Sequence, residues 1–230
     1  MNSFFKITFY ALVLLLSVKQ YAQHHSDITA ELNTENKTLN IQQQITFFNQ
    51  SNDTLTSIVL NDWNNAFSTK NTPLAKRFSD EFYRGFHLAK EEERGSTKNV
   101  IILDANKLVL SWERPDRNPD LIEIKLSQNL LPNQKIVLQL TYLTKIPSDK
   151  FTKYGYNNNG IIHLKNWFLT PARYENHDFI RYSNTNLDDI ANAYSSFEID
   201  LKTPKNFEAI SDLKSSKSSV NDPFINYKLS

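Results

Sequence analysis

Residues 38–49 alternate between apolar and polar side chains with a period of two. Such alternation predicts a β-strand with one buried face and one face in water. The predicted buried face carries Leu39, Ile41, Ile45 and Phe47, and the predicted wet face carries Asn40, Gln42, Gln44 and Thr46. The polar cluster 50–53 predicts a turn, and apolar β-branched residues resume in 54–61. Because a long hairpin with one apolar face is not stable alone, we expect further strands to cover it.

The same alternation recurs along the chain with turn residues between the segments. A strand at 27–33, together with 38–49 and 54–61, predicts a three-stranded antiparallel start. Further strands are expected at 99–103, 107–112, 121–126, 135–143, 161–164, 195–202 and 224–229. Strands that follow one another at intervals of roughly ten residues are typical of an antiparallel β-sandwich. The predicted fold class is therefore all-β, and no internal repeat of fixed period interrupts it.

One short helix is expected within this β pattern. Thr72 is a suitable N-cap, and Pro73 suits the first helical position because its missing amide would have had no partner there. Apolar residues at spacing four predict a stripe that packs on a sheet, formed by Leu74, Phe78, Phe82 and Phe86. The charged run 90–96 ends the helix and predicts a solvated loop.

The N-terminal 22 residues have the pattern of a signal peptide. Lys6 precedes an apolar segment, Ile7–Val18, and Gln20-Tyr21-Ala22 is a passable cleavage site. The apolar segment is short of the ~20 residues that a membrane-spanning helix needs. We therefore expect residues 1–22 to be removed and the rest to be exported to the periplasm or the medium, with no integral membrane segment after cleavage.

The composition limits the classes of partner and the kinds of chemical site that the chain can have. The chain of 230 residues carries 26 basic and 25 acidic residues, a net charge of +1 that gives no reason to expect nucleic acid as a partner. Hydrophobic residues make up 40% of the chain, which is enough for a substantial core. Cysteine is absent, so disulfides, thiolate metal sites and a cysteine nucleophile are excluded.

The five histidines do not form a zinc-peptidase motif. Such a motif, His-Glu-x-x-His on a helix, places both imidazoles on one face, and none of these histidines has that spacing. They are His24, His25, His87, His163 and His177. His87 lies near the acidic run Glu91–Glu93, which could bring one carboxylate beside it, and the other interpretation is a histidine at a helix end. For His24 and His25, next to the expected cleavage site, disorder is expected, and His163 and His177 are expected to be structural.

No other catalytic pattern is evident. With 4 glycines the chain contains no Gly-x-Ser-x-Gly elbow, phosphate-binding loop or dinucleotide fingerprint. The nearest acidic pair, Asp188 and Asp189, is interpreted as a turn or a helix cap. All three tryptophans follow strand segments, and we expect them in the core rather than in a sugar-binding groove. We therefore assign no catalytic, cofactor-binding or metal-binding residue.

Five ordered pieces of the sequence resemble the N-terminal β-sandwich of aminopeptidase N-like zinc peptidases (gluzincins), especially divergent exported bacterial members. They read ITAELNTENKTLNIQQQITFFNQSNDTLTSIVLNDW, NNAFSTKNTPLAKRF, LLPNQKIVLQLTYLTKIP, FTKYGYNNNGIIHLKNWFLTPARY and SSFEIDLKTPKNFEAISD. Together they span Ile28 to Asp212. The resemblance rests on the order of the pieces, because no single motif is decisive.

This resemblance implies a zinc-binding catalytic domain that would begin beyond this chain. In the family that domain carries Gly-x-Met-x-Asn, His-Glu-x-x-His and a downstream glutamate, so zinc is expected there and no cofactor is expected here. The family's residue that grips the substrate amine has no counterpart in 164–171. The expected organisation is a signal peptide (1–22), the β-sandwich (23–213) and a tail or the start of a truncated continuation (214–230).

Two functional hypotheses remain open from the sequence. The first is a non-catalytic N-terminal domain, or a truncated fragment, of an exported zinc aminopeptidase-like protein that flanks and restricts the peptide cleft of the catalytic domain. The second is a stand-alone secreted β-sandwich that binds a peptide, a glycan or a partner protein. The sequence leaves open whether the chain has any enzymatic activity of its own.

Overall fold

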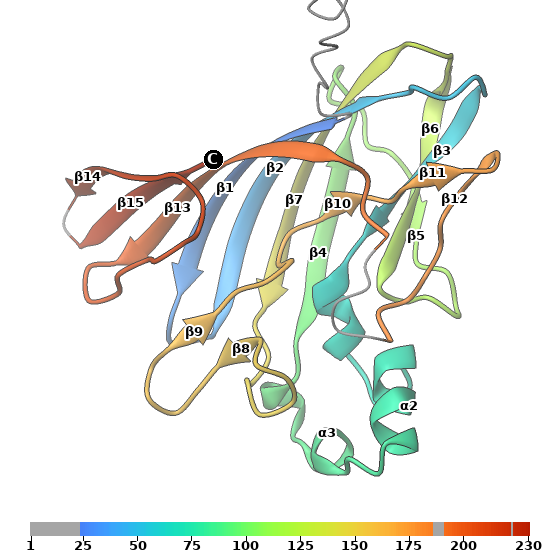
Figure 1. Ribbon diagram of the computed structural model, residues 1–230. Coiled ribbons are helices and arrows are strands. Elements are labelled where there is room, and N and C mark those ends of the chain that lie inside the picture. Colours follow the sequence, from blue (N-terminus) through green and yellow to red (C-terminus); the bar gives the residue numbers. More distant parts are fainter. Residues whose placement is uncertain (1–23, 186–190, 222) are drawn as a thin grey trace, which may run out of the picture.

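The structure is a computed structural model that describes residues 24–185, 191–221 and 223–230. The fold is all-β with a short helical insertion, as predicted (Figure 1). The strands are β1 His24–Asn33, β2 Thr38–Phe48, β3 Leu55–Asn61, β4 Ser96–Leu103, β5 Trp112–Glu113, β6 Leu121–Leu130, β7 Lys135–Lys145, β8 Gly155–Tyr156, β9 Ile162–His163, β10 Thr170–Pro171, β11 Tyr174–Glu175, β12 Asp178–Phe179, β13 Ser195–Pro204, β14 Ser215–Asn221 and β15 Phe224–Leu229. The helical segments are η1 Trp63–Phe67, α2 Pro73–Asp80, α3 Gly85–Leu88 and η2 Glu91–Glu93.

A large curved sheet of seven strands forms one layer, in the order β14-β15-β13-β1-β2-β7-β4. Its pairs are antiparallel except β1 with β13, which run parallel. The alternation predicted for 38–49 is confirmed in β2, where every second residue is buried. The final residues, whose membership the sequence left open, form β14 and β15 at one end of this sheet.

A second sheet, in the order β10-β3-β6-β5, packs over the other end of the large one (Figure 1). The predicted three-stranded start is wrong at its third member, because β3 pairs with β6 rather than with β2. The turn after β2 carries the chain across to the opposite layer, held by the Asn49 side-chain amide, which donates to the carbonyl oxygens of Asp53 (2.8 Å) and Leu130 (3.1 Å). Once there, β3 is buried at four successive positions, 58–61, as expected of a strand enclosed on both faces.

The predicted strand at 107–112 is also wrong, because only Trp112 lies in a strand, β5. The Asp104 carboxylate closes a tight turn by accepting from the amides of Asn106 (2.8 Å) and Leu108 (3.0 Å). Leu108 and Val109 are consequently exposed rather than paired in a sheet, apart from one isolated bridge of Val109. The short strand β12, for which no strand was predicted, pairs with β11.

Helix α2 begins as predicted, with the Thr72 hydroxyl accepting from the Ala75 amide at 3.1 Å. The predicted stripe fails at Phe82, which is 92% exposed, while Leu74, Phe78 and Phe86 are buried. Helix α2 ends at Asp80, before the last residues of the predicted apolar stripe. It ends there because the backbone of Phe82 adopts the left-handed conformation, with φ 58°. The amide of Tyr83 then donates to the carbonyl of Phe78 at 2.7 Å, the bond of a Schellman C-terminal cap.

Phe82→Gly is therefore expected to stabilise the protein. Glycine adopts positive φ without steric cost, and the exposed ring makes little packing to lose, so the expected gain is about 1 kcal/mol. Chemical denaturation measures it, with Phe82→Ala as the control that retains a Cβ. Equal stability of the Gly and Ala variants would show that backbone strain at this position is negligible.

The buried apolar side chains form one continuous cluster with members from β1, β2, β3, β4, β6, β7, β13 and β15. Trp63 and Trp167 belong to it, as predicted, and Trp112 packs against it half-buried. Among the described residues, no helix combines the length and the hydrophobicity needed to cross a bilayer. The predicted signal peptide, residues 1–22, lies outside the described residues.

Candidate functional site

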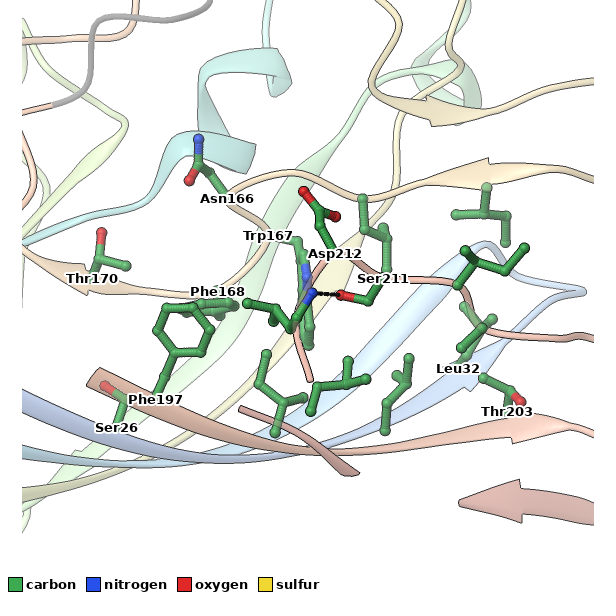
Figure 2. A pocket seen from close by; sticks show the side chains of 18 of the residues that line it. Ser26, Leu32, Asn166, Trp167, Phe168, Thr170, Phe197, Thr203, Ser211 and Asp212 are labelled. Carbon is green, nitrogen blue, oxygen red and sulfur yellow. Dashed lines mark hydrogen bonds between the residues drawn. The ribbon is translucent and has the colours of Figure 1, made fainter. Parts of the chain in front are cut away.

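A large hollow lies on the inner face of the large sheet, at the end that the second sheet does not cover. It has a volume of about 1170 Å³. Its floor is formed by alternate residues of β13 with neighbours from β1 and β15, and its roof chiefly by Leu164, 166–168 and 206–213. Residues of 159–162, 170–171 and 192–194 complete the lining. Figure 2 shows Trp167 and Phe168 between its two ends, with Ser26 and Thr170 towards one end and Leu32 and Thr203 towards the other.

Aromatic rings form much of this wall. Phe168 packs against Phe197 of the floor with ring centroids 5.7 Å apart, and against Trp167 at 5.2 Å. Apolar side chains thus define the interior, and the charged lining residues Glu208 and Asp212 are both exposed. An arrangement of this kind can bind an apolar ligand, and among the described lining residues no nucleophile is paired with a base.

A buried hydrogen-bond network fixes the segment that enters the cavity roof. Gln43 of β2 donates from Nε2 to the carbonyl oxygen of Leu169 at 2.7 Å, and its Oε1 accepts from the Tyr142 hydroxyl at 2.6 Å. The Tyr142 oxygen in turn accepts from the Leu169 amide at 3.1 Å. Both backbone groups of Leu169 are therefore paired with side chains of the large sheet. Burial raises the pKa of Tyr142, so its hydroxyl remains the donor that this network needs.

Sequence reasoning missed Gln43. It was not assigned to the apolar side of 38–49, although a period of two puts it there between Ile41 and Ile45. The signal was available, because a polar residue in the middle of a buried face must find a partner. The residue therefore marked a buried polar contact that the sequence could have predicted, although not the identity of its partners.

A second network joins the two layers through a buried carboxylate. Asp62 is 2% exposed and accepts from the Thr97 hydroxyl at 2.7 Å and from Arg114 Nη2 at 2.6 Å. Its backbone amide donates to the carbonyl of Asp120 at 2.8 Å. The Arg114 guanidinium also donates to the Pro119 carbonyl at 2.7 Å. This side-chain network therefore stabilises the junction of β3 with β4, β5 and β6.

Asp120 anchors the segment that follows β12. Its carboxylate accepts from the Ser183 hydroxyl at 2.5 Å and from the Asn184 amide at 2.6 Å. Burial raises the pKa of Asp120, and these two donors act in the opposite direction. The pair Asp188 and Asp189, considered from the sequence, lies outside the described residues.

The expectation of disorder at His24 and His25 is wrong, because both residues lie in β1. The His24 ring is buried and stacks on Phe47 with centroids 4.3 Å apart. Its Nδ1 accepts from the Phe48 amide at 3.2 Å, a role that requires an unprotonated nitrogen. Parallel pairing with β13 fixes this end of β1, which could not be inferred from the local sequence.

The other histidines make separate local contacts. His25 lies 2.8 Å from the Ser196 hydroxyl, and His177 lies 2.9 Å from the Asp53 carboxylate. His87 Nε2 lies 2.9 Å from the Ala75 carbonyl and 2.7 Å from the Ser79 hydroxyl, rather than against the acidic run 91–93. His163 lies in the short strand β9, as its sequence context predicted. Within the described part of the chain, no group of three histidine, aspartate or glutamate side chains is arranged to hold a metal ion.

Stability is expected to fall below pH 6.5 because His24 is buried as a neutral ring. Burial lowers its pKa to about 4. Since the folded-state pKa lies below that of the unfolded chain, the unfolded chain binds the extra proton between pH 6.5 and 4. The stabilisation is fully present above pH 6.5 and is lost as the pH falls to about 4, a total of about 3 kcal/mol at about 1.4 kcal/mol per unit.

Denaturation of the wild type and of His24→Gln at a series of pH values isolates this contribution, because the glutamine does not titrate. The wild type should lose more stability than His24→Gln between pH 7 and pH 4. His25→Gln, which removes the neighbouring and more exposed imidazole, should retain the steep pH dependence of stability of the wild type. Parallel pH profiles for the wild type and His24→Gln would contradict the assignment.

No family model and no curated protein matches this chain. Solved structures that are similar include an M1 zinc metallopeptidase from Deinococcus radiodurans, with a TM-score of 0.45 and 11% sequence identity over 90% of this chain. A mutant of the enzyme from the same organism bound to a Tyr-Ser-Ala substrate has a TM-score of 0.46 and 10% identity. The chain spans 38% of the length of each of these structures.

Proposed function

We propose that this chain is the non-catalytic N-terminal domain of an exported zinc aminopeptidase-like protein. Its role is to flank and restrict the peptide cleft of a catalytic domain that carries the zinc. The observation that carries this proposal is the ordered set of five sequence pieces between Ile28 and Asp212. These pieces contribute strands to both main sheets, including β2, β3, β7 and β13, so the resemblance extends over the framework rather than one local motif.

The contacts of the ionisable side chains support a structural role. His24 supports the β1–β2 pair, His87 packs beside α2, and Asp62 joins the two layers. Each of these groups holds elements of the fold together through the contacts described above. Export rests on the apolar segment Ile7–Val18 behind Lys6, and it is part of the same proposal.

Reading the gene beyond the codon for Ser230 tests the proposal. The expected result is an open frame that continues into Gly-x-Met-x-Asn and His-Glu-x-x-His with a downstream glutamate. A stop codon with no zinc motif within the following few hundred codons would count heavily against it.

A stand-alone secreted binding module is the second candidate. The observation that favours it is the continuous core, which includes Ile225, Tyr227 and Leu229 of the last strand as well as the first. This candidate predicts that residues 23–230 are monomeric in solution and unfold in one cooperative transition. Aggregation of that fragment, or a large surface that binds hydrophobic dyes, would instead favour a missing neighbouring domain.

A further inference from the structure

The cavity floor is the inner face of the large sheet at its β13–β15 end. The second sheet packs over the opposite end of the large one (Figure 1). Loop segments complete the cavity wall here, chiefly Leu164, 166–168 and 206–213, with further lining residues from 159–162, 170–171 and 192–194. Phe197, Ile199 and Leu201 point into the cavity from alternate positions of β13. At about 1170 Å³, the hollow exceeds the roughly 300–1,000 Å³ of ordinary small-molecule sites.

The backbone of the floor has no free hydrogen-bonding edge. β13 pairs with β1 on one side and with β15 on the other, and β1 pairs in turn with β2. A peptide lying on this face would bury its own amides and carbonyls without partners, which is costly. A hydrocarbon chain has no such groups, so an aliphatic ligand suits the floor better than a polypeptide segment.

The charge of the lining residues limits which polar head group an aliphatic ligand in this cavity can carry. The charged residues that line the cavity are Glu208 and Asp212, both acidic and both exposed, and no described lining residue is basic. In Figure 2 the Asp212 and Asn166 side chains are both seen on the roof side of the cavity, opposite the sheet. A carboxylate or phosphate head group would be repelled there, whereas an uncharged or cationic one would not.

We propose that this cavity binds a long single aliphatic chain that ends in an uncharged or cationic head group. The chain lies along β13 beneath Trp167 and Phe207, and the head group lies near Asp212. This binding site is independent of the role proposed above, because it requires no catalytic domain.

Tryptophan quenching tests the proposal on the whole chain, produced with its own N-terminal segment. The probe is a monoacylglycerol whose acyl chain carries two bromine atoms, used below its critical micelle concentration. We expect saturable quenching with one probe per protein, because Trp167 lines the cavity. Trp167→Phe should remove most of the quenching while native mass spectrometry still detects the 1:1 complex.

Ala209→Phe adds a ring to the roof and should weaken binding at least tenfold, whereas Ala105→Phe, in the exposed turn after β4, should leave it unchanged.

Dodecylammonium should bind and palmitate should bind at least tenfold more weakly, and Asp212→Asn should reduce that difference. No saturable binding, or equal binding by Ala209→Phe and wild type, would overturn the proposed site. Palmitate binding as tightly as dodecylammonium would overturn the proposed head-group preference.

Discussion

Gln43→Ala is expected to destabilise the protein by about 4 kcal/mol, because it leaves two buried partners unpaired at about 1–3 kcal/mol each and adds a small cavity. The Tyr142 hydroxyl loses its acceptor, and the Leu169 carbonyl loses its donor. Both groups are in the core, where water cannot replace the lost bonds. Chemical denaturation followed by circular dichroism measures the change in the free energy of unfolding.

The chain contains a matched control in the adjacent glutamines. Gln42 and Gln44 are exposed on the opposite face of β2, so alanine at either position should change stability by no more than about 0.5 kcal/mol. A double variant, Gln43→Leu with Tyr142→Phe, removes several polar groups together and should be more stable than the sum of the two single changes predicts. Equal effects of Gln43→Ala and Gln44→Ala would refute the network.

Asp62→Ala is expected to cost about 4 kcal/mol, since removing one partner of a buried ion pair typically costs 3–5 kcal/mol. The Arg114 guanidinium, whose side chain is 20% exposed, would lose its carboxylate, and the Thr97 hydroxyl would lose its acceptor. Because this network joins β3 to β4 and β5, the loss should weaken the contact between the two sheets. Denaturation with both fluorescence and circular dichroism would record it.

The exposed ion pair of Arg77 with Glu81 on α2 is the control. Both side chains are about half exposed, so Glu81→Ala should cost no more than about 0.5 kcal/mol. If Asp62→Ala were as mild as Glu81→Ala, the buried pair would contribute little to the junction of the layers.

Local periodicity predicted most of the long strands. The alternation in 38–49, 135–143 and 195–202 corresponds to β2, β7 and β13, because a half-buried strand imposes a period of two on its own sequence. The N-cap at Thr72 was also predictable from the local sequence, because its hydrogen-bond partner Ala75 is only three residues away. These features depend on neighbours in the chain.

Features that depend on distant residues were not predictable. The turn chemistry at 50–53 is compatible with a hairpin, yet β3 joins another sheet because β6 is available there to pair with it. Likewise β13, which lies far from β1 in the sequence, fixes His24 in a strand by parallel pairing with β1. The left-handed backbone at Phe82 ends the helix, although the spacing of apolar residues predicted that the buried stripe would continue through this position. In each case a tertiary contact or a single backbone angle decided the outcome.

The candidate site was predictable only in part. In the predicted strand 195–202, a period of two places Phe197, Ile199 and Leu201 on one face, which is the cavity floor. The roof at 206–213 has no such periodic pattern. The hollow forms where the second sheet ceases to cover the large sheet. The position of that boundary depends on tertiary packing, so a local sequence pattern does not predict it. The cavity therefore had to be found in the structure.

Aminopeptidase activity tests the central claim most directly, measured on this chain and on the product of its complete reading frame. The proposal predicts that the chain alone does not hydrolyse aminoacyl-p-nitroanilides, whereas the longer product does so and loses this activity when a chelator removes zinc. Chelator-sensitive hydrolysis by the chain alone would contradict it, as would a longer product without such activity.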